Sequence, residues 1–91
     1  MKTVAEALSK TLFWDVDPEK LDWERNKQLI IERTFQRGIT HEVDTIFSVY
    51  SIMQLKNALL KSKTLDRKSA NYFSIKLNIP LSHIYVAPEY Y

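Results

Sequence analysis

The sequence predicts an all-α fold: a single small bundle of about five helices with a helix-turn-helix-like C-terminal pair and an extended C-terminal tail. Apolar residues recur at intervals of three and four, the period of an amphipathic helix, and no six-residue stretch alternates as a half-buried strand would. One Gly and three Pro in 91 residues favour long unbroken elements. We therefore expect one helical domain over residues 1–91, with a core at about 12–80, an N-terminal helix at 3–12 and a tail at 81–91.

The N-terminal helix is expected to begin at Thr3, because Glu6 follows three residues later and the two can form a capping box. Its buried face is expected to contain Val4, Leu8 and Leu12. Beyond this helix, Asp17 followed by Pro18 has the pattern of an N-cap and a first helical residue. A short turn is therefore predicted at 18–21.

The main helix is predicted to run from Asp22 or Trp23 to Arg37, with Asp22 as the candidate cap. Gly38 is expected to end this helix in a left-handed conformation, which glycine adopts without steric cost. The side of the helix that faces the core is expected to consist of Trp23, Ile30, Ile31, Thr34 and Phe35.

Two further helices are predicted between residues 40 and 62. Thr40 can cap the first, and Glu42 in its first turn complements the helix dipole. Ser51 and Gln54 form a second capping box and place the start of the next helix, expected at 52–62. The inward residues of the two helices are expected to be Val43, Ile46, Phe47 and Tyr50, then Ile52, Leu55 and Leu59.

The fifth helix is expected to begin after Asp66 as its cap, and Leu65 can form an apolar staple with the first turns. Asn78 is suited to end it and Pro80 prevents its continuation. One more turn is expected at 81–84, followed by an extended arm. The buried face of the fifth helix is expected to contain Ala70, Phe73 and Leu77.

Composition excludes several classes of protein. The chain has 13 basic and 11 acidic residues, a net charge of +2, and an ordinary apolar content, so disorder is not expected. The absence of Cys excludes a disulfide scaffold and a thiolate-bound metal. No apolar run approaches the roughly 18 residues of a membrane span, and a charge interrupts the N-terminal apolar stretch, unlike in a secretory signal. We expect a cytoplasmic protein.

Residues that carry enzymatic chemistry are not grouped in the sequence. His41 and His83 are the only histidines, and neither has a second metal ligand four residues on. No Ser-His-Asp set, Cys-His pair or HExxH motif is present. We therefore expect a protein that is not an enzyme and that uses neither a cofactor nor a metal ion.

Basic residues concentrate in the C-terminal half. Residues 1–50 carry 7 basic and 9 acidic side chains, whereas residues 51–91 carry 6 basic and 2 acidic ones. A short turn at 63–65 would join the last two helices at a sharp angle, as in a helix-turn-helix. The candidate DNA contacts are Lys63, Arg67, Lys68, Asn71 and Lys76. The alternative is a solvated face of an ordinary helix pair.

An acidic run at 15–24 directly follows Trp14 and contains Trp23. Its carboxylates can form helix caps, hold an ion, act in acid-base chemistry, or dock a basic partner. Phe13 and Trp14 are expected to fill the core rather than to stack on a ligand, although an exposed Trp14 would suit a protein partner. Exposed tyrosines of the tail also suit an interface. The candidate partner contacts are Trp14, Asp15, Asp17, Tyr85 and Tyr90.

The chain resembles a family of short bacterial proteins of unknown function over residues 12–80. The shared pattern consists of Leu12-Phe13-Trp14-Asp15, Asp17, Ile30-Ile31-Glu32-Arg33, Gly38, Leu65-Asp66 and Asn78-Ile79-Pro80. The chain departs from that pattern at Thr34-Phe35-Gln36, where the family favours Val-Leu-Glu, and in its tyrosine-rich end.

Genes of that family often lie beside nucleotidyltransferase-type toxins of abortive-infection systems. The resemblance therefore implies an antitoxin-like, non-enzymatic protein whose partner is such a toxin. It also implies a second possibility, a DNA-binding transcriptional regulator that uses the helix beginning near Asp66. The resemblance supplies no site residues.

Overall fold

The computed structural model describes residues 3–62 and 65–84, and these residues form helices and no strand. The all-α prediction is therefore confirmed. The five α-helices are α1 (Val4–Ala7), α2 (Lys27–Arg37), α3 (Thr40–Val49), α4 (Ile52–Lys61) and α5 (Arg67–Leu77). Short 3-10 helices lie at Lys10–Phe13, Pro18–Lys20 and Leu81–His83.

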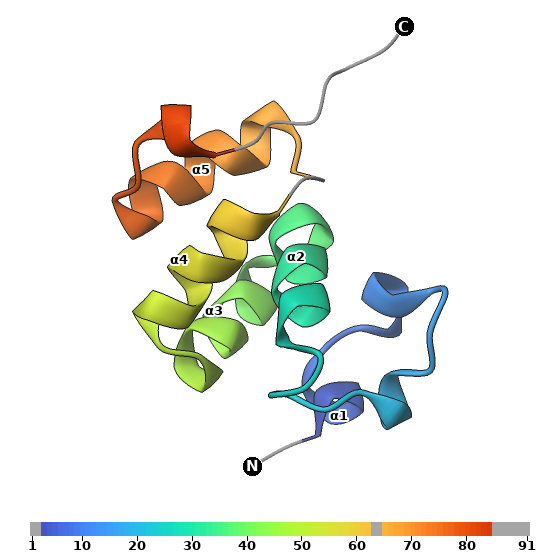
Figure 1. Ribbon diagram of the computed structural model, residues 1–91. Coiled ribbons are helices and arrows are strands. Elements are labelled where there is room, and N and C mark those ends of the chain that lie inside the picture. Colours follow the sequence, from blue (N-terminus) through green and yellow to red (C-terminus); the bar gives the residue numbers. More distant parts are fainter. Residues whose placement is uncertain (1–2, 63–64, 85–91) are drawn as a thin grey trace, which may run out of the picture.

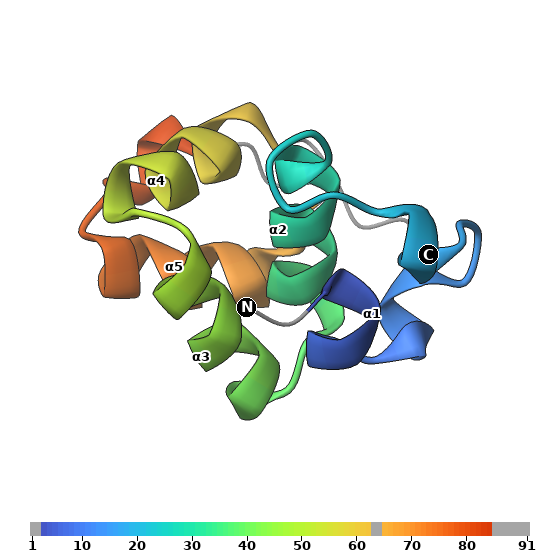
Figure 2. The same cartoon turned by 90° about the horizontal axis from the view of Figure 1, so that it is seen from below.

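Helix α2 lies between the N-terminal segment on one side and α3, α4 and α5 on the other (Figures 1 and 2). Ile30 and Ile31 of α2 are buried in the shared apolar core. Phe35, one turn further along, stacks on Phe73 of α5 with ring centroids 3.8 Å apart. Because burial of these side chains removes large apolar areas from water, α2 is the element around which the other helices are organised.

The N-terminal helix is shorter than the sequence predicts. The capping box of Thr3 and Glu6 forms as expected, but α1 ends at Ala7 and Leu8 is extended. The reason is a tertiary hydrogen bond: the Ser9 amide donates to Oε2 of Glu42 at 2.6 Å, so it is not available to continue the helix. Ser9 then caps a separate 3-10 helix. The expected buried residues Val4, Leu8 and Leu12 are all buried.

The start of α2 also differs from the prediction. Asp22 caps a turn rather than the helix, because its Oδ2 accepts hydrogen bonds from the amides of Glu24 and Arg25 at 3.0 and 2.7 Å. The helix begins at Lys27, with Asn26 at the N-cap. Trp23 consequently lies before the helix and is half-buried against the core.

Gly38 ends α2, as expected, but not in a left-handed conformation. Its φ of −71° and ψ of 149° are extended, because the chain continues directly into α3. Ile39 rather than Thr40 is the N-cap of α3, and Thr40 is the first helical residue. The need for glycine is steric, since a Cβ at this position would lie 2.6 Å from the carbonyl oxygen of Thr34.

The predicted capping residues of α4 and α5 are confirmed. The amide of Gln54 donates to Ser51 Oγ, and the amide of Ser51 donates to Gln54 Oε1. Asp66 Oδ1 accepts from the amide of Ser69 at 3.1 Å, and Asn78 takes the left-handed conformation with φ of 57°. Such caps satisfy helix-end groups that would otherwise lack partners.

One core prediction for α4 is wrong. Ile52 is 51% exposed, whereas Leu55 and Leu59 are buried as expected. The buried face of α4 also includes Ala58, which places Ile52 at the margin of that face. Helices α4 and α5 pack against each other as the expected C-terminal pair. Of the predicted tail, residues 81–83 form the expected turn and Ile84 is buried, while 85–91 lie outside the described residues.

Tyr50 ties the end of α3 to the turn before α2. Its hydroxyl donates to the carbonyl oxygen of Trp23 at 2.6 Å, and the two rings meet edge to face. Burial, followed by the nearby charges of Glu24 and Asp22, raises the pKa of Tyr50 above its ordinary value.

Tyr50→Phe is expected to lower the free energy of unfolding by about 1 kcal/mol at neutral pH, because the Trp23 carbonyl loses its donor. The wild type should also lose stability as the pH rises above about 10, where the unfolded tyrosine releases its proton and the folded one retains it. Urea unfolding at several pH values checks both effects. If wild type and Tyr50→Phe lost stability equally above about pH 10, the raised pKa of Tyr50 would be contradicted.

Candidate binding surface at Trp14

Trp14 is a large aromatic side chain that lies outside the core, next to α2. It follows the 3-10 helix Lys10–Phe13, whose residues Leu12 and Phe13 are both buried. Trp14 itself is 60% exposed. The expectation of a core position is therefore confirmed for Phe13 and wrong for Trp14. Two adjacent buried residues fix the backbone so that the Trp14 ring lies on the surface.

Two arginines of α2 lie over this ring. The guanidinium carbons of Arg33 and Arg37 are 4.3 and 4.6 Å from the ring centroid. Residues four apart lie on the same helix face, which brings both guanidinium groups to Trp14. Each such cation–π contact contributes about 0.5–1 kcal/mol at an exposed site. The ring is thus held against α2 although most of its surface is open to solvent.

Arg33 is itself fixed by a fork of hydrogen bonds. Its Nη1 and Nη2 donate to the two carboxylate oxygens of Asp15, both at 2.9 Å, and Nη1 also donates to the carbonyl oxygen of Leu12 at 3.1 Å. The hydrogen bond from Arg33 lowers the pKa of Asp15, and the same bond raises the pKa of Arg33. Paired bonds of this kind restrict orientation as well as distance. We call Trp14, Asp15, Arg33 and Arg37 together the Trp14 face.

Most of the acidic run serves local structure. Asp17 Oδ1 accepts from the amide of Glu19 at 3.0 Å, Asp22 caps its own turn, and Glu24 forms an ion pair with Lys27. Of the candidate partner contacts, the structure brings Trp14 and Asp15 together and gives Asp17 a capping role. Tyr85 and Tyr90 lie outside the described residues.

The sequence alone did not single out Arg33 and Arg37. They are separated from Trp14 by about twenty residues, and nothing local marks them among thirteen basic side chains. The available signal was their spacing: two arginines four apart on a predicted helix share one face.

The candidate DNA contacts on α5 fall into two groups. Arg67, Lys68 and Asn71 are exposed in its first two turns. Lys76 is also exposed, but its Nζ lies 5.1 Å from the ring of Phe47 and is therefore directed back towards the protein. Lys63 lies outside the described residues.

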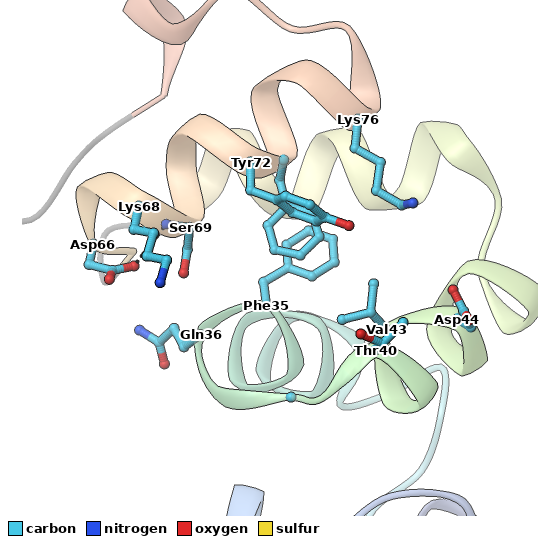
Figure 3. Close-up of a pocket in the computed structure, with 12 residues that line it drawn as sticks. Phe35, Gln36, Thr40, Val43, Asp44, Asp66, Lys68, Ser69, Tyr72 and Lys76 are labelled. Atoms are coloured by element: carbon cyan, nitrogen blue, oxygen red, sulfur yellow. Dashed lines mark hydrogen bonds between the residues drawn. The ribbon is translucent and has the colours of Figure 1, made fainter.

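A groove of about 480 Å³ lies between α5, the end of α2 and the start of α3 (Figure 3). Phe35 points into it beneath Tyr72, while Lys68 and Lys76 lie towards its two ends (Figure 3). Thr40 and Asp44 contribute from α3. No sequence pattern indicates this groove, because residues from three separate helices line it.

Within residues 3–62 and 65–84, no three His, Asp or Glu side chains gather closely enough to hold a metal ion. None of the helices in the described part of the chain has the length and apolar character needed to cross a membrane.

The fold and the Trp14 face define a small all-α protein with a fixed, exposed tryptophan. Residues 8–59 match the model of a family of unknown function, DUF6922, and since this is more than half of the chain, the protein belongs to that family. The match includes every residue of the Trp14 face and ends before α5 begins. Comparisons with curated proteins and with solved structures gave no match.

Proposed function

We propose that the protein is a non-enzymatic, antitoxin-like interaction protein that binds a protein partner through the Trp14 face. The observation that carries this proposal is the 60% exposure of a tryptophan held by two arginines. Trp and Arg are enriched among the residues that contribute most to protein–protein binding.

The rigidity of the face supports the same proposal. Arg33 is fixed by Asp15 and by the Leu12 carbonyl, and it in turn lies over Trp14. Ordering a flexible side chain on binding costs about 0.5–1.5 kcal/mol, and a side chain already held in place avoids most of this cost. The arrangement suits a surface that binds without rearrangement.

The nature of the partner is proposed from the resemblance. The pattern shared with short bacterial proteins encoded beside nucleotidyltransferase-type toxins includes Trp14, Asp15 and Arg33. We therefore take such a toxin as the proposed partner. Its binding by a non-enzymatic protein requires a contact surface and no catalytic group.

Trp14→Ala is expected to reduce capture of the partner by about tenfold or more, since truncation of a central aromatic contact costs about 2 kcal/mol or more. The measurement is capture by tagged protein from nuclease-treated lysate of the native host, quantified by mass spectrometry. Met53→Ala is the matched control, because Met53 is an apolar side chain of α4 that is 66% exposed and is not part of the Trp14 face.

Thermal unfolding of both variants checks that the fold is intact. A partner captured equally by wild type and Trp14→Ala would contradict the proposal, as would an equal loss with Met53→Ala.

A second candidate function is binding of DNA through α5. It is favoured by the exposure of Arg67, Lys68 and Asn71 in the first two turns of that helix, since Arg and Asn side chains read guanine and adenine. The same capture without nuclease tests it. DNA fragments enriched by wild type, released by salt and lost with Arg67→Ala and Lys68→Ala would support this function, and their absence would contradict it.

A further inference from the structure

The two arginines of the Trp14 face have different roles. Arg33 directs both terminal nitrogens to protein acceptors, namely Asp15 and the Leu12 carbonyl. Arg37 is exposed, lies over the ring of Trp14, and has no carboxylate partner among residues 3–62 and 65–84. Its hydrogen-bond donors therefore point into solvent beside an exposed aromatic surface.

The charges of the face do not cancel. Asp15 is matched by Arg33 in a paired hydrogen bond, which leaves the guanidinium group of Arg37, within the described part of the chain, as a charge next to Trp14 with no carboxylate paired to it. A guanidinium group presents a planar set of donors that fits a carboxylate through two parallel bonds. Charge complementarity at this face thus favours a partner that supplies a negative group.

We infer that the Trp14 face recognises an acidic segment of the partner protein, in which a carboxylate pairs with Arg37 and an adjacent apolar side chain covers the Trp14 ring. This inference rests on the proposed function and adds the chemistry of the partner to it. Arg37 is then the residue that determines specificity, while Trp14 supplies the apolar contact area. Further carboxylates follow Trp14 in the sequence at 17–24, and these would favour a basic partner. Binding of basic segments is therefore the opposing result in the test below.

The test is a selection of phage-displayed random peptides on the full-length protein. Peptides enriched on wild type are expected to contain an excess of Asp and Glu next to an apolar residue. Arg37→Gln should abolish that excess and weaken binding of a selected peptide by about tenfold, the effect of removing one member of a close charge pair. Arg25→Gln is the matched control, since Arg25 is an exposed arginine in the turn before α2 and is not part of the Trp14 face, and it should leave both unchanged.

The outcomes separate this inference from the proposed function. Loss of the selected peptides with Trp14→Ala, together with an acidic excess that depends on Arg37, supports both. Selected peptides whose binding requires Trp14 but that are basic would overturn the inference of an acidic partner and leave the proposed function standing. Peptides whose binding is the same in wild type and Arg37→Gln would have the same consequence. A selection that enriches no peptide also overturns this inference, whereas the proposed function is decided separately by capture from lysate. Peptides that bind Trp14→Ala as well as wild type count against both.

Discussion

Gly38→Ala is expected to lower the free energy of unfolding by about 1–3 kcal/mol, the usual cost of forcing an atom into a packed site. The added Cβ would lie 2.6 Å from the carbonyl oxygen of Thr34 and 2.8 Å from its Cγ2. Thr34 cannot move easily, because it is buried and its hydroxyl donates to the carbonyl oxygen of Ile30 at 2.8 Å. The backbone at residue 38 would therefore have to shift away from the last turn of α2.

Whether Gly38→Ala raises or lowers the free energy of unfolding distinguishes a close contact from open space at this position. At the φ and ψ of Gly38 alanine is an allowed residue, and in open space Gly→Ala would stabilise by about 0.4–1 kcal/mol through the unfolded chain. Urea unfolding of the two proteins gives the difference directly. Thr34→Ser removes Cγ2 but keeps the carbonyl oxygen, so Gly38→Ala should remain destabilising in that background. A stabilised Gly38→Ala variant would contradict the close approach.

Glu42→Ala is expected to destabilise the protein by about 1–3 kcal/mol, because it removes the acceptor of two backbone amides. Glu42 is 5% exposed. Its Oε2 accepts from the amide of Ser9 at 2.6 Å and its Oε1 accepts from the amide of Ile39 at 3.1 Å. One carboxylate thus caps α3 and fastens the N-terminal segment to it.

Amide hydrogen exchange distinguishes this role from a general loss of stability. In Glu42→Ala the amides of Ser9 and Ile39 should exchange faster than the loss of global stability explains. Asp44→Ala is the matched control, since Asp44 is an exposed acid on the same helix, and it should leave the exchange of both amides unchanged. Equal protection of the Ser9 amide in wild type and Glu42→Ala would disprove the fastening.

The parts of the fold that depend on residues close together in the sequence could be predicted from the sequence. Thr3, Ser51 and Asp66 cap their helices as expected, because a cap is determined by side chains and amides within three positions. The apolar period also identified most of the core. The break after α1 could not be predicted, since it depends on Glu42, 33 residues away from Ser9.

The candidate site was predictable only in part. The sequence indicated Trp14 and Asp15 as partner contacts, but it favoured a core position for the Trp14 ring. The Trp14 ring is exposed because the preceding 3-10 helix buries Leu12 and Phe13. No local sequence pattern determines which side of that short helix is buried. The arginines that hold the ring come from α2, so their role emerges only when the two segments meet.

The central claim is that the partner covers the Trp14 ring. The chain has two tryptophans, so an isotope-labelled sample gives two indole N–H resonances, which Trp14→Phe assigns. On addition of the captured partner, the Trp14 resonance is expected to shift or broaden, while that of half-buried Trp23 stays in place. An unchanged Trp14 resonance in a sample whose backbone signals show binding elsewhere, for instance on α5, would contradict the claim.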